Sequence, residues 1–326
     1  VFGSEMFYGS PVDMEDAVKA SVSENGQFDP AMFGGAAMKK VTPLWMLKHL
    51  PNMPACHVGI SINADGPNNT LVIGDVSGVA AVIESISCLE RGIAKLMIAG
   101  ATGTRINTTR MNYRADLPLA SVADPVEFSS RPHDPESQGV VGGEAAATLV
   151  LERSEDAQKR DATVLARIVS YASCFIASGG MRKAQRSSEP EPQSRGSAEA
   201  MKRSMVTALA DAGIKAEQVG LVVCHGMGDP VIDLAERTAL SEVVPDAPVV
   251  ATIASLGHSG AASGMVDLVT GALALVKRQV PPTVQHAATA TSIGFRDAAE
   301  AMSLNHVLCL SHTSEGNAIT VVLESP

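Results

Sequence analysis

The sequence predicts an α/β fold made of two similar halves, and two observations support this prediction. Short apolar segments alternate with longer segments whose apolar residues have helical spacing, which is the pattern of repeated strand–helix units. Two pairs of segments also recur: TLVLE at residues 148–152 matches TVVLE at 320–324, and Ser-Gly-led helices are predicted at 77–92 and 263–279. The recurrence indicates an internal duplication, with mostly parallel sheets that helices cover on both faces.

The first half is assigned to residues 1–160. Its predicted elements are an apolar strand at residues 1–6, a second strand at 69–75, then helix 77–92 and strand 148–152. The strand at 1–6 corresponds to a later strand of the second half, at residues 219–223. We therefore expect that the first half lacks its first strand–helix unit in this numbering.

The second half is assigned to residues 161–326. Its predicted strands and helices follow in order at residues 166–173, 197–213, 219–223, 249–254, 263–279 and 320–324. Residues 176–196 are polar and rich in Pro and Ser, and they are predicted to form a surface loop. The basic side chains of this loop either attract an acidic partner or form an ordinary solvated surface; they are Arg182, Lys183, Arg186 and Arg195.

Composition excludes several classes of function. The 326 residues are 45% apolar, which is enough to bury a large core. Aromatic residues make up only 3% and the net charge is −10, so a nucleic-acid-binding role is not expected. The five cysteines have irregular spacing without a metal or disulfide pattern, which favours a reducing compartment, and we expect a cytoplasmic protein. No apolar run is expected to reach the roughly 18 residues of a membrane span.

Two histidines are the first candidates for catalysis. His225 follows the predicted strand at residues 219–223, and His258 follows the one at 249–254. Each lies beside glycine where an apolar run ends, at the strand end where α/β sheets usually place their chemistry. The alternative is that each imidazole is a hydrogen-bonded core residue.

Four segments carry a family resemblance. HGMGDPVIDLAE, GHSGAASG, VPPT and the stretch RPHDPESQGVVGGEAAATLVLE resemble, in order and spacing, the segments of β-ketoacyl synthases, the condensing enzymes of fatty-acid and polyketide synthesis. The resemblance implies a thiolase-like fold, with two duplicated halves in an αβαβα layered arrangement. It also implies catalytic roles for His225 and His258, an acyl carrier protein as partner, and no cofactor or metal.

The chain departs from the family at the nucleophile. The turn that carries the family's cysteine holds Asp75, just before Ser77 and Gly78. A carboxylate is a poor nucleophile toward a thioester, and the five cysteines are predicted to be buried, inert thiols. We expect Asp75 to cap the helix that begins at Ser77 or to pair with an imidazole.

Two further positions weaken the catalytic case. The family's lysine before its second histidine is replaced by Ile253. The family's Gly-Phe-Gly-Gly loop, which gates the pocket and supplies an oxyanion-hole amide, appears as HTSEG, one residue shorter and without Phe. The resemblance assigns binding roles in this loop to Ser314, Gly316 and Asn317, while the shortened, charged loop argues against an intact oxyanion hole.

Three functions fit these observations. The favoured one is a non-elongating subunit resembling a chain length factor. The second is a decarboxylase of malonyl-carrier thioesters, against which the charge of Asp75 counts because it repels the malonyl carboxylate. The third is an ordinary condensing enzyme in which Asp75 is an altered residue. The resemblance further implies a homodimer, or a heterodimer with a Cys-bearing ketosynthase, joined along the strand that enters this turn. The uncharged segment TLVI at residues 70–73 suits a strand buried between subunits, and the alternative is that it is an internal strand of one sheet.

Overall fold

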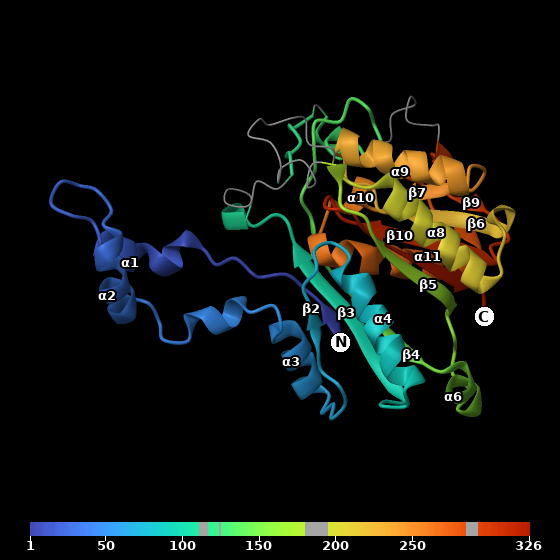
Figure 1. The fold of residues 1–326 in the computed structure, drawn as a ribbon, viewed down its shortest axis with the longest axis horizontal. Coiled ribbons are helices and arrows are strands. Elements are labelled where there is room, and N and C mark those ends of the chain that lie inside the picture. The colour runs from blue at the N-terminus through green and yellow to red at the C-terminus, as the bar shows by residue number, and fades with distance from the viewer. Residues whose placement is uncertain (111–116, 124, 180–194, 285–292) are drawn as a thin grey trace.

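The computed structural model describes residues 1–110, 117–123, 125–179, 195–284 and 293–326 (Figure 1). A four-stranded sheet has the strand order β2–β1–β3–β4. Its strands are β1 (Phe2–Gly3), β2 (Thr70–Leu71), β3 (Leu96–Thr104) and β4 (Glu144–Glu152). Strand β1 runs parallel to both β2 and β3, whereas β4 is antiparallel to β3.

A five-stranded sheet has the order β5–β11–β10–β6–β7. Its strands are β5 (Arg167–Phe175), β6 (Val219–Cys224), β7 (Val249–Ala251), β10 (His306–His312) and β11 (Asn317–Glu324). Strands β10, β6 and β7 are parallel, and β11 is antiparallel to both of its neighbours. A small separate sheet pairs β8 (Gln279–Val280) with β9 (Glu300–Ala301).

The two sheets repeat one topology, as the recurring segments predict. In the first half β1, β2, α4, β3 and β4 follow one another, and β6, β7, α11, β10 and β11 follow in the same order and with the same strand directions in the second half. Strand β5 and helix α8 have no counterpart among the described residues of the first half. The duplicated arrangement is therefore present in the fold.

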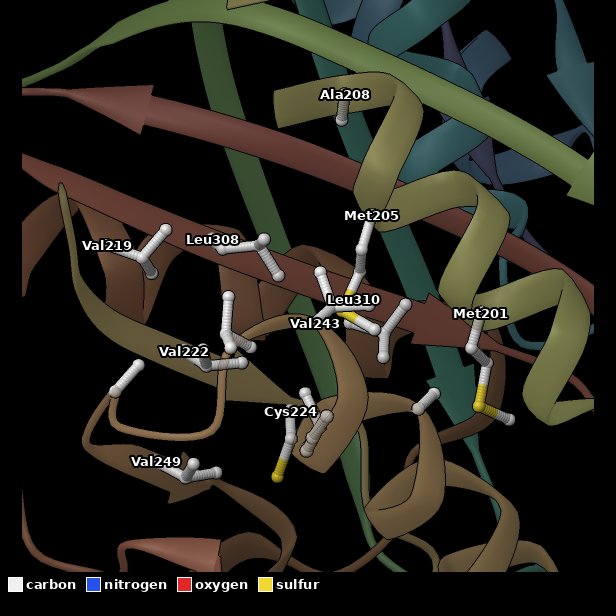
Figure 2. Packing of buried hydrophobic residues seen from close by; sticks show 14 of the residues in the cluster. Met201, Met205, Ala208, Val219, Val222, Cys224, Val243, Val249, Leu308 and Leu310 are labelled. Atoms are coloured by element: carbon white, nitrogen blue, oxygen red, sulfur yellow. The ribbon is translucent and has the colours of Figure 1, made fainter. Parts of the chain in front are cut away.

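Helices fill the space between the sheets and cover the second one. Helices α4 (Ser77–Glu90) and α11 (Ser263–Lys277) lie between the sheets, while α8 (Ala198–Ala212) and α9 (Pro230–Val243) cover the other face of the five-stranded sheet (Figure 1). Strand alternation divides the core: Leu308 and Leu310 of β10 pack toward Met205 of α8 (Figure 2). The intervening Val307 and Cys309 pack toward α11.

The two central helices meet at glycines. A Cβ added to Gly78 of α4 would lie 2.7 Å from the Ala261 carbonyl oxygen, just before α11. A Cβ added to Gly264 of α11 would lie 2.6 Å from Val79 Cγ2. The Ser-Gly start that both helices share therefore serves the close approach of the two halves.

Three expectations about the sheets and their strands are corrected. Both sheets contain antiparallel pairs, because β4 and β11 each return antiparallel to the preceding strand without a crossover helix. The four-stranded sheet is still mostly parallel, whereas the five-stranded sheet has as many antiparallel as parallel pairs. The four-stranded sheet is also open on its outer face within the described residues, where the side chains of Glu144, Ala146, Thr148 and Val150 are exposed. The strand predicted to reach residue 254 ends at Ala251, and the short helix α10 (Ile253–Leu256) follows it.

The connection between β1 and β2, residues 4–69, is an extended arm. It contains α1 (Glu15–Lys19), α2 (Pro30–Lys40) and α3 (Met53–Ser61), with short 3₁₀ turns at Pro11–Met14 and Trp45–His49. Figure 1 shows α1 and α2 well away from both sheets. Apolar arm side chains are exposed, including Met38 at 88% and Ile60 at 72%. Helix α9 fills the corresponding connection of the second half and packs in the core.

The expectation that no segment could span a membrane by length and composition is wrong. The helical segment Gly260–Lys277 is long and apolar enough to do so. It is a core helix here, because it packs against β10, β6 and β4 between the two sheets. The described residues also contain α6 (Ser154–Lys159), after β4, and 3₁₀ turns at Val126–Phe128, Ala216–Gln218 and Gly260–Ala262. Most of the predicted surface loop, with Arg182, Lys183 and Arg186, lies outside the described residues.

Candidate active site

The turn that leads into α4 holds Asp75. Gly74, with φ of +78°, makes the turn, and the Ser77 hydroxyl fastens it by accepting from the Ile73 N–H at 2.9 Å and donating to the Gly74 carbonyl at 2.5 Å. The expectation that Asp75 caps the helix is wrong, because Val76 precedes the helix and makes no side-chain cap. The Asp75 carboxylate is free to point elsewhere, and it is buried.

The main partner of Asp75 is Arg105, which lies just beyond the carboxyl end of β3. Its Nη2 donates to Asp75 Oδ1, and its Nε lies 3.9 Å from Glu5 Oε1. Glu5 Oε2 in turn lies 3.1 Å from Arg110 Nη1. Burial raises the pKa of Asp75, but the charge of Arg105 is the largest opposing influence, and the pKa falls to about 2. Asp75 is therefore an ionised carboxylate in a buried ion cluster.

The backbone of His258 is held in place by residues 141–143, which precede β4. Its N–H donates to the Val141 carbonyl at 2.8 Å, and its own carbonyl accepts from Gly143 N at 2.9 Å. Nδ1 accepts from the Gly260 N–H at 3.3 Å, so the proton of the neutral ring lies on Nε2, 3.6 Å from Asp75 Oδ2. Burial lowers the pKa of His258 to about 3 despite the nearby Asp75. This imidazole is a neutral donor.

His225 lies directly after β6, and its ring contacts two other imidazoles. Its ring centroid is 5.4 Å from that of His258 and 4.9 Å from that of His312. Nδ1 lies 3.6 Å from Oδ2 of Asp267, a buried residue of α11 that also accepts a 2.7 Å bond from Thr252 Oγ1. Burial lowers the pKa of His225, but Asp267 and Asp75 together raise it above the ordinary value. The His225 imidazole therefore takes up a proton more readily than the His258 imidazole does.

Helix α9 organises the turn after β6 with two carboxylates. Glu236 accepts from the N–H groups of His225 at 2.8 Å and Gly226 at 2.9 Å. Asp233, one helical turn earlier, accepts from Met227 at 2.8 Å and Gly228 at 2.9 Å. The acidic residues of HGMGDPVIDLAE thus satisfy the buried N–H groups that follow His225.

The structure brings Asp75, His225 and His258 together: each offers a ligand atom, and these atoms lie within 4.8 Å of one another. A second such group, His133, Cys224 and Glu236, lies behind His225. Arg105 and His312 are the site neighbours that sequence reasoning missed. The position of both directly after or at the end of a strand, like that of His225, is the pattern that points to them.

Of the three predicted binding residues, Ser314 and Gly316 lie in the turn between β10 and β11, and Asn317 is the first residue of β11. The Ser314 carbonyl accepts from Gly196 N at 2.7 Å, and the Gly316 carbonyl accepts from Ile176 N at 3.0 Å. Asn317 Nδ2 donates to Thr313 Oγ1 at 3.3 Å. Within the described residues these hydrogen bonds anchor the turn to its neighbours rather than to Asp75 or the imidazoles. Thr313 is the turn residue beside the nucleophile position, because a Cβ on Gly74 would meet its Cγ2 at 3.4 Å.

Comparison with protein families identifies two matching domain models. Residues 12–157 match the β-ketoacyl synthase N-terminal domain, and residues 174–287 match the β-ketoacyl synthase C-terminal domain. The chain is 31% identical over 255 residues to 3-oxoacyl-[acyl-carrier-protein] synthase 2 of Staphylococcus aureus, which covers 77% of this chain and 59% of the relative. It is 30% identical over 253 residues to the protein of that name from Coxiella burnetii, covering 76% and 58%. The chain thus spans less than two thirds of these relatives.

Solved structures agree on the fold. A type II polyketide synthase acyl-carrier protein in complex with its ketosynthase bound to the hexaketide matches with a TM-score of 0.80 at 19% identity, over 100% of this chain and 77% of that one. The ishigamide ketosynthase/chain length factor matches with a TM-score of 0.74 at 20% identity, covering 100% and 75%. A β-ketoacyl synthase from Burkholderia phymatum gives 0.77 at 22%, covering 100% and 74%. The predicted thiolase-like fold is confirmed.

Proposed function

The chain belongs to the β-ketoacyl synthase family, and from this premise we propose that it is a non-elongating subunit that pairs with a Cys-bearing ketosynthase of fatty-acid or polyketide synthesis. Its role resembles that of a chain length factor. One observation carries the proposal: the nucleophile turn holds Asp75 as a buried, ionised carboxylate bound to Arg105 and close to His258. A carboxylate in this state does not form the acyl thioester that chain elongation requires.

The chain's own thiols support this proposal. Burial raises the pKa of Cys224 and of Cys309 well above the ordinary thiol value, so neither thiol is an activated nucleophile. Cys88 is buried in the middle of α4. All five cysteines are free, in keeping with the proposed cytoplasmic location.

A partner subunit is supported by apolar surface that this chain leaves uncovered. Strand β2 is an edge of its sheet, and the residues that follow it, Val72 and Ile73, are half exposed. The arm at residues 4–69 exposes further apolar side chains. An open strand edge beside apolar side chains is the kind of surface that an obligate interface buries. A structural relative is itself described as a ketosynthase/chain length factor, which favours a heterodimer over a homodimer.

An acyl carrier protein is the proposed second partner. A structural relative is a ketosynthase in complex with its acyl-carrier protein. We propose that a carrier docks on the assembled pair, and that the covalent acyl chain resides on the cysteine of the partner subunit.

Co-expression with a candidate ketosynthase tests the pairing. We expect the two chains to purify together in equal amounts, and intact-mass spectrometry with acyl-carrier substrate to find the acyl adduct on the partner only. A matched variant, Ser77→Ala, shows whether the neighbouring hydroxyl carries any acyl group. An adduct on this chain that disappears in Asp75→Ala or Ser77→Ala would overturn the proposal.

Decarboxylation of a malonyl-carrier thioester is the second candidate, and one observation favours it. Arg105 neutralises Asp75, so the repulsion of the malonyl carboxylate is weaker than the sequence alone suggests. The neutral His258, with its proton on Nε2, is suited to donate to an enolate oxygen. Conversion of malonyl to acetyl carrier, lost in His258→Ala, would identify this activity.

The ion pair of Arg105 with Asp75 also supports Asp75 as a native residue rather than an altered one.

A further inference from the structure

A second group of chemically active side chains lies behind the candidate site and has no role in the proposed function. Cys224 ends β6, His312 ends β10, Glu236 lies on α9, and His133 lies in the loop before β4. The side chains of His133, Glu236 and His312 are fully buried, as is Cys224. His312 Nε2 makes no hydrogen bond within the described residues. A sulfur, two imidazole nitrogens and a carboxylate oxygen thus converge in the interior.

Three of the distances among these atoms match a tetrahedral zinc site. Cys224 Sγ lies 3.5 Å from His133 Nε2, and Glu236 Oε2 lies 3.1 Å from His133 Nε2 and 3.4 Å from His312 Nε2. Ligands at zinc bond lengths of about 2.0–2.3 Å and tetrahedral angles are about 3.3–3.6 Å apart. These three pairs of atoms therefore have nearly the separations that one bound ion would impose. His133, Cys224 and Glu236 offer ligand atoms that all lie within 4.8 Å of one another, and His312 joins this group through its contact with Glu236.

The surrounding structure holds these ligands in place. His133 N donates to Asp233 Oδ2 at 2.7 Å, and Arg237 donates to the His133 carbonyl oxygen. Glu236 also accepts the two N–H bonds from His225 and Gly226. Ligands that are themselves hydrogen-bonded or fixed by the backbone are typical of metal centres.

The neighbouring group of Asp75, His225 and His258 does not fit a metal in the same way. His258 Nδ1 accepts a hydrogen bond from Gly260, so Nε2, which faces the group, carries a proton and has no lone pair to offer. Arg105 places a guanidinium on Asp75, where it repels a cation. The donor set with sulfur is the better site.

We propose that His133, Cys224, Glu236 and His312 bind one zinc ion as a structural centre. The mixed sulfur, nitrogen and oxygen donors select zinc rather than magnesium or calcium, and the closed, fully buried site leaves no open position for substrate. The ion joins the ends of β6 and β10 to α9 and to the loop at residues 131–137. Through Glu236 it also fixes the backbone of His225. The proposal revises the expectation that the chain has no metal ligands.

Metal analysis of the purified chain tests the site. We expect roughly one equivalent of zinc per chain after dialysis. After removal of zinc, addition of Co²⁺ alone is expected to give the absorption of a tetrahedral cobalt ion with a thiolate-to-metal charge-transfer band. In Cys224→Ala the charge-transfer band should be absent and the zinc content should fall at least tenfold.

Cys309→Ala is the matched control. Cys309 is also buried and lies on β10, but its Sγ contacts the Asp267 carbonyl outside the group. This variant should keep both the zinc and the band. Equal zinc in Cys224→Ala and Cys309→Ala, or a wild-type chain with neither zinc nor the cobalt band, would overturn the proposal. The wild-type cobalt spectrum decides the matter alone if Cys224→Ala does not fold, and neither measurement depends on the proposed pairing with a ketosynthase.

Discussion

Replacement of Arg105 by methionine removes the charge that keeps Asp75 ionised in the interior. Because the pKa of Asp75 lies at about 2 rather than at its ordinary 3.8, this carboxylate contributes about 2 kcal/mol to folding at neutral pH. The contribution is complete above the ordinary pKa and is lost as the pH falls toward 2. Without the guanidinium, burial raises the pKa of Asp75 instead, and we expect Arg105→Met to cost about 3–5 kcal/mol.

A double-mutant cycle separates this pair from the other contacts of Arg105, which include Glu5. Urea unfolding at neutral pH, followed by circular dichroism, is the assay for Arg105→Met, Asp75→Asn and the double variant. Asp75→Asn should recover part of the stability lost in Arg105→Met, giving a coupling of about 1–3 kcal/mol. The deficit of Arg105→Met should also be smaller at about pH 4.5, where protonation neutralises Asp75. A coupling below about 0.5 kcal/mol would refute the reasoning.

Three further predictions follow from the same packing and charges. Gly103→Ala should lower the free energy of unfolding in urea by about 3 kcal/mol or more, because its Cβ would lie 2.0 Å from a backbone oxygen. Gly34→Ala, in the exposed helix α2, should instead raise the free energy of unfolding by about 0.5–1 kcal/mol. Equal effects of the two substitutions would contradict this prediction. Asp75→Cys should create a thiol that iodoacetamide alkylates at neutral pH, detected by peptide mass spectrometry, because the helix start and the guanidinium favour a thiolate. Asp267→Asn should lower the pKa of His225 in an NMR titration, and an unchanged value would remove Asp267 as its main partner.

The pairing of His225 with His258 could be predicted from the sequence, because each follows an apolar strand beside glycine. Parallel neighbouring strands bring such ends together without further information. Arg105 also follows a strand, but its pairing with Asp75 could not be predicted, since the contact depends on β3 lying beside β1 in the four-stranded sheet. The cap expected of Asp75 failed for a local reason: the Ser77 hydroxyl already fastens the turn.

The direction of the strands could also not be predicted from the sequence. The segments at residues 148–152 and 320–324 show by their likeness that the halves repeat, but likeness carries no information on orientation. Only the short turn between β10 and β11 favours an antiparallel pair. His133 and His312 each belong to a different segment, and no spacing in the sequence connects them with Cys224.

The glycines at the starts of α4 and α11 have a consequence for how this protein changes over evolutionary time. Each half presents a bare backbone to the other, so a larger residue at Gly78 or Gly264 would push the two halves apart. A substitution tolerated in one copy must therefore suit the other, and the duplicated units cannot diverge independently along this seam. The two halves differ instead in the connections between their strands: one half has the packed helix α9, and the other has the long arm at residues 4–69.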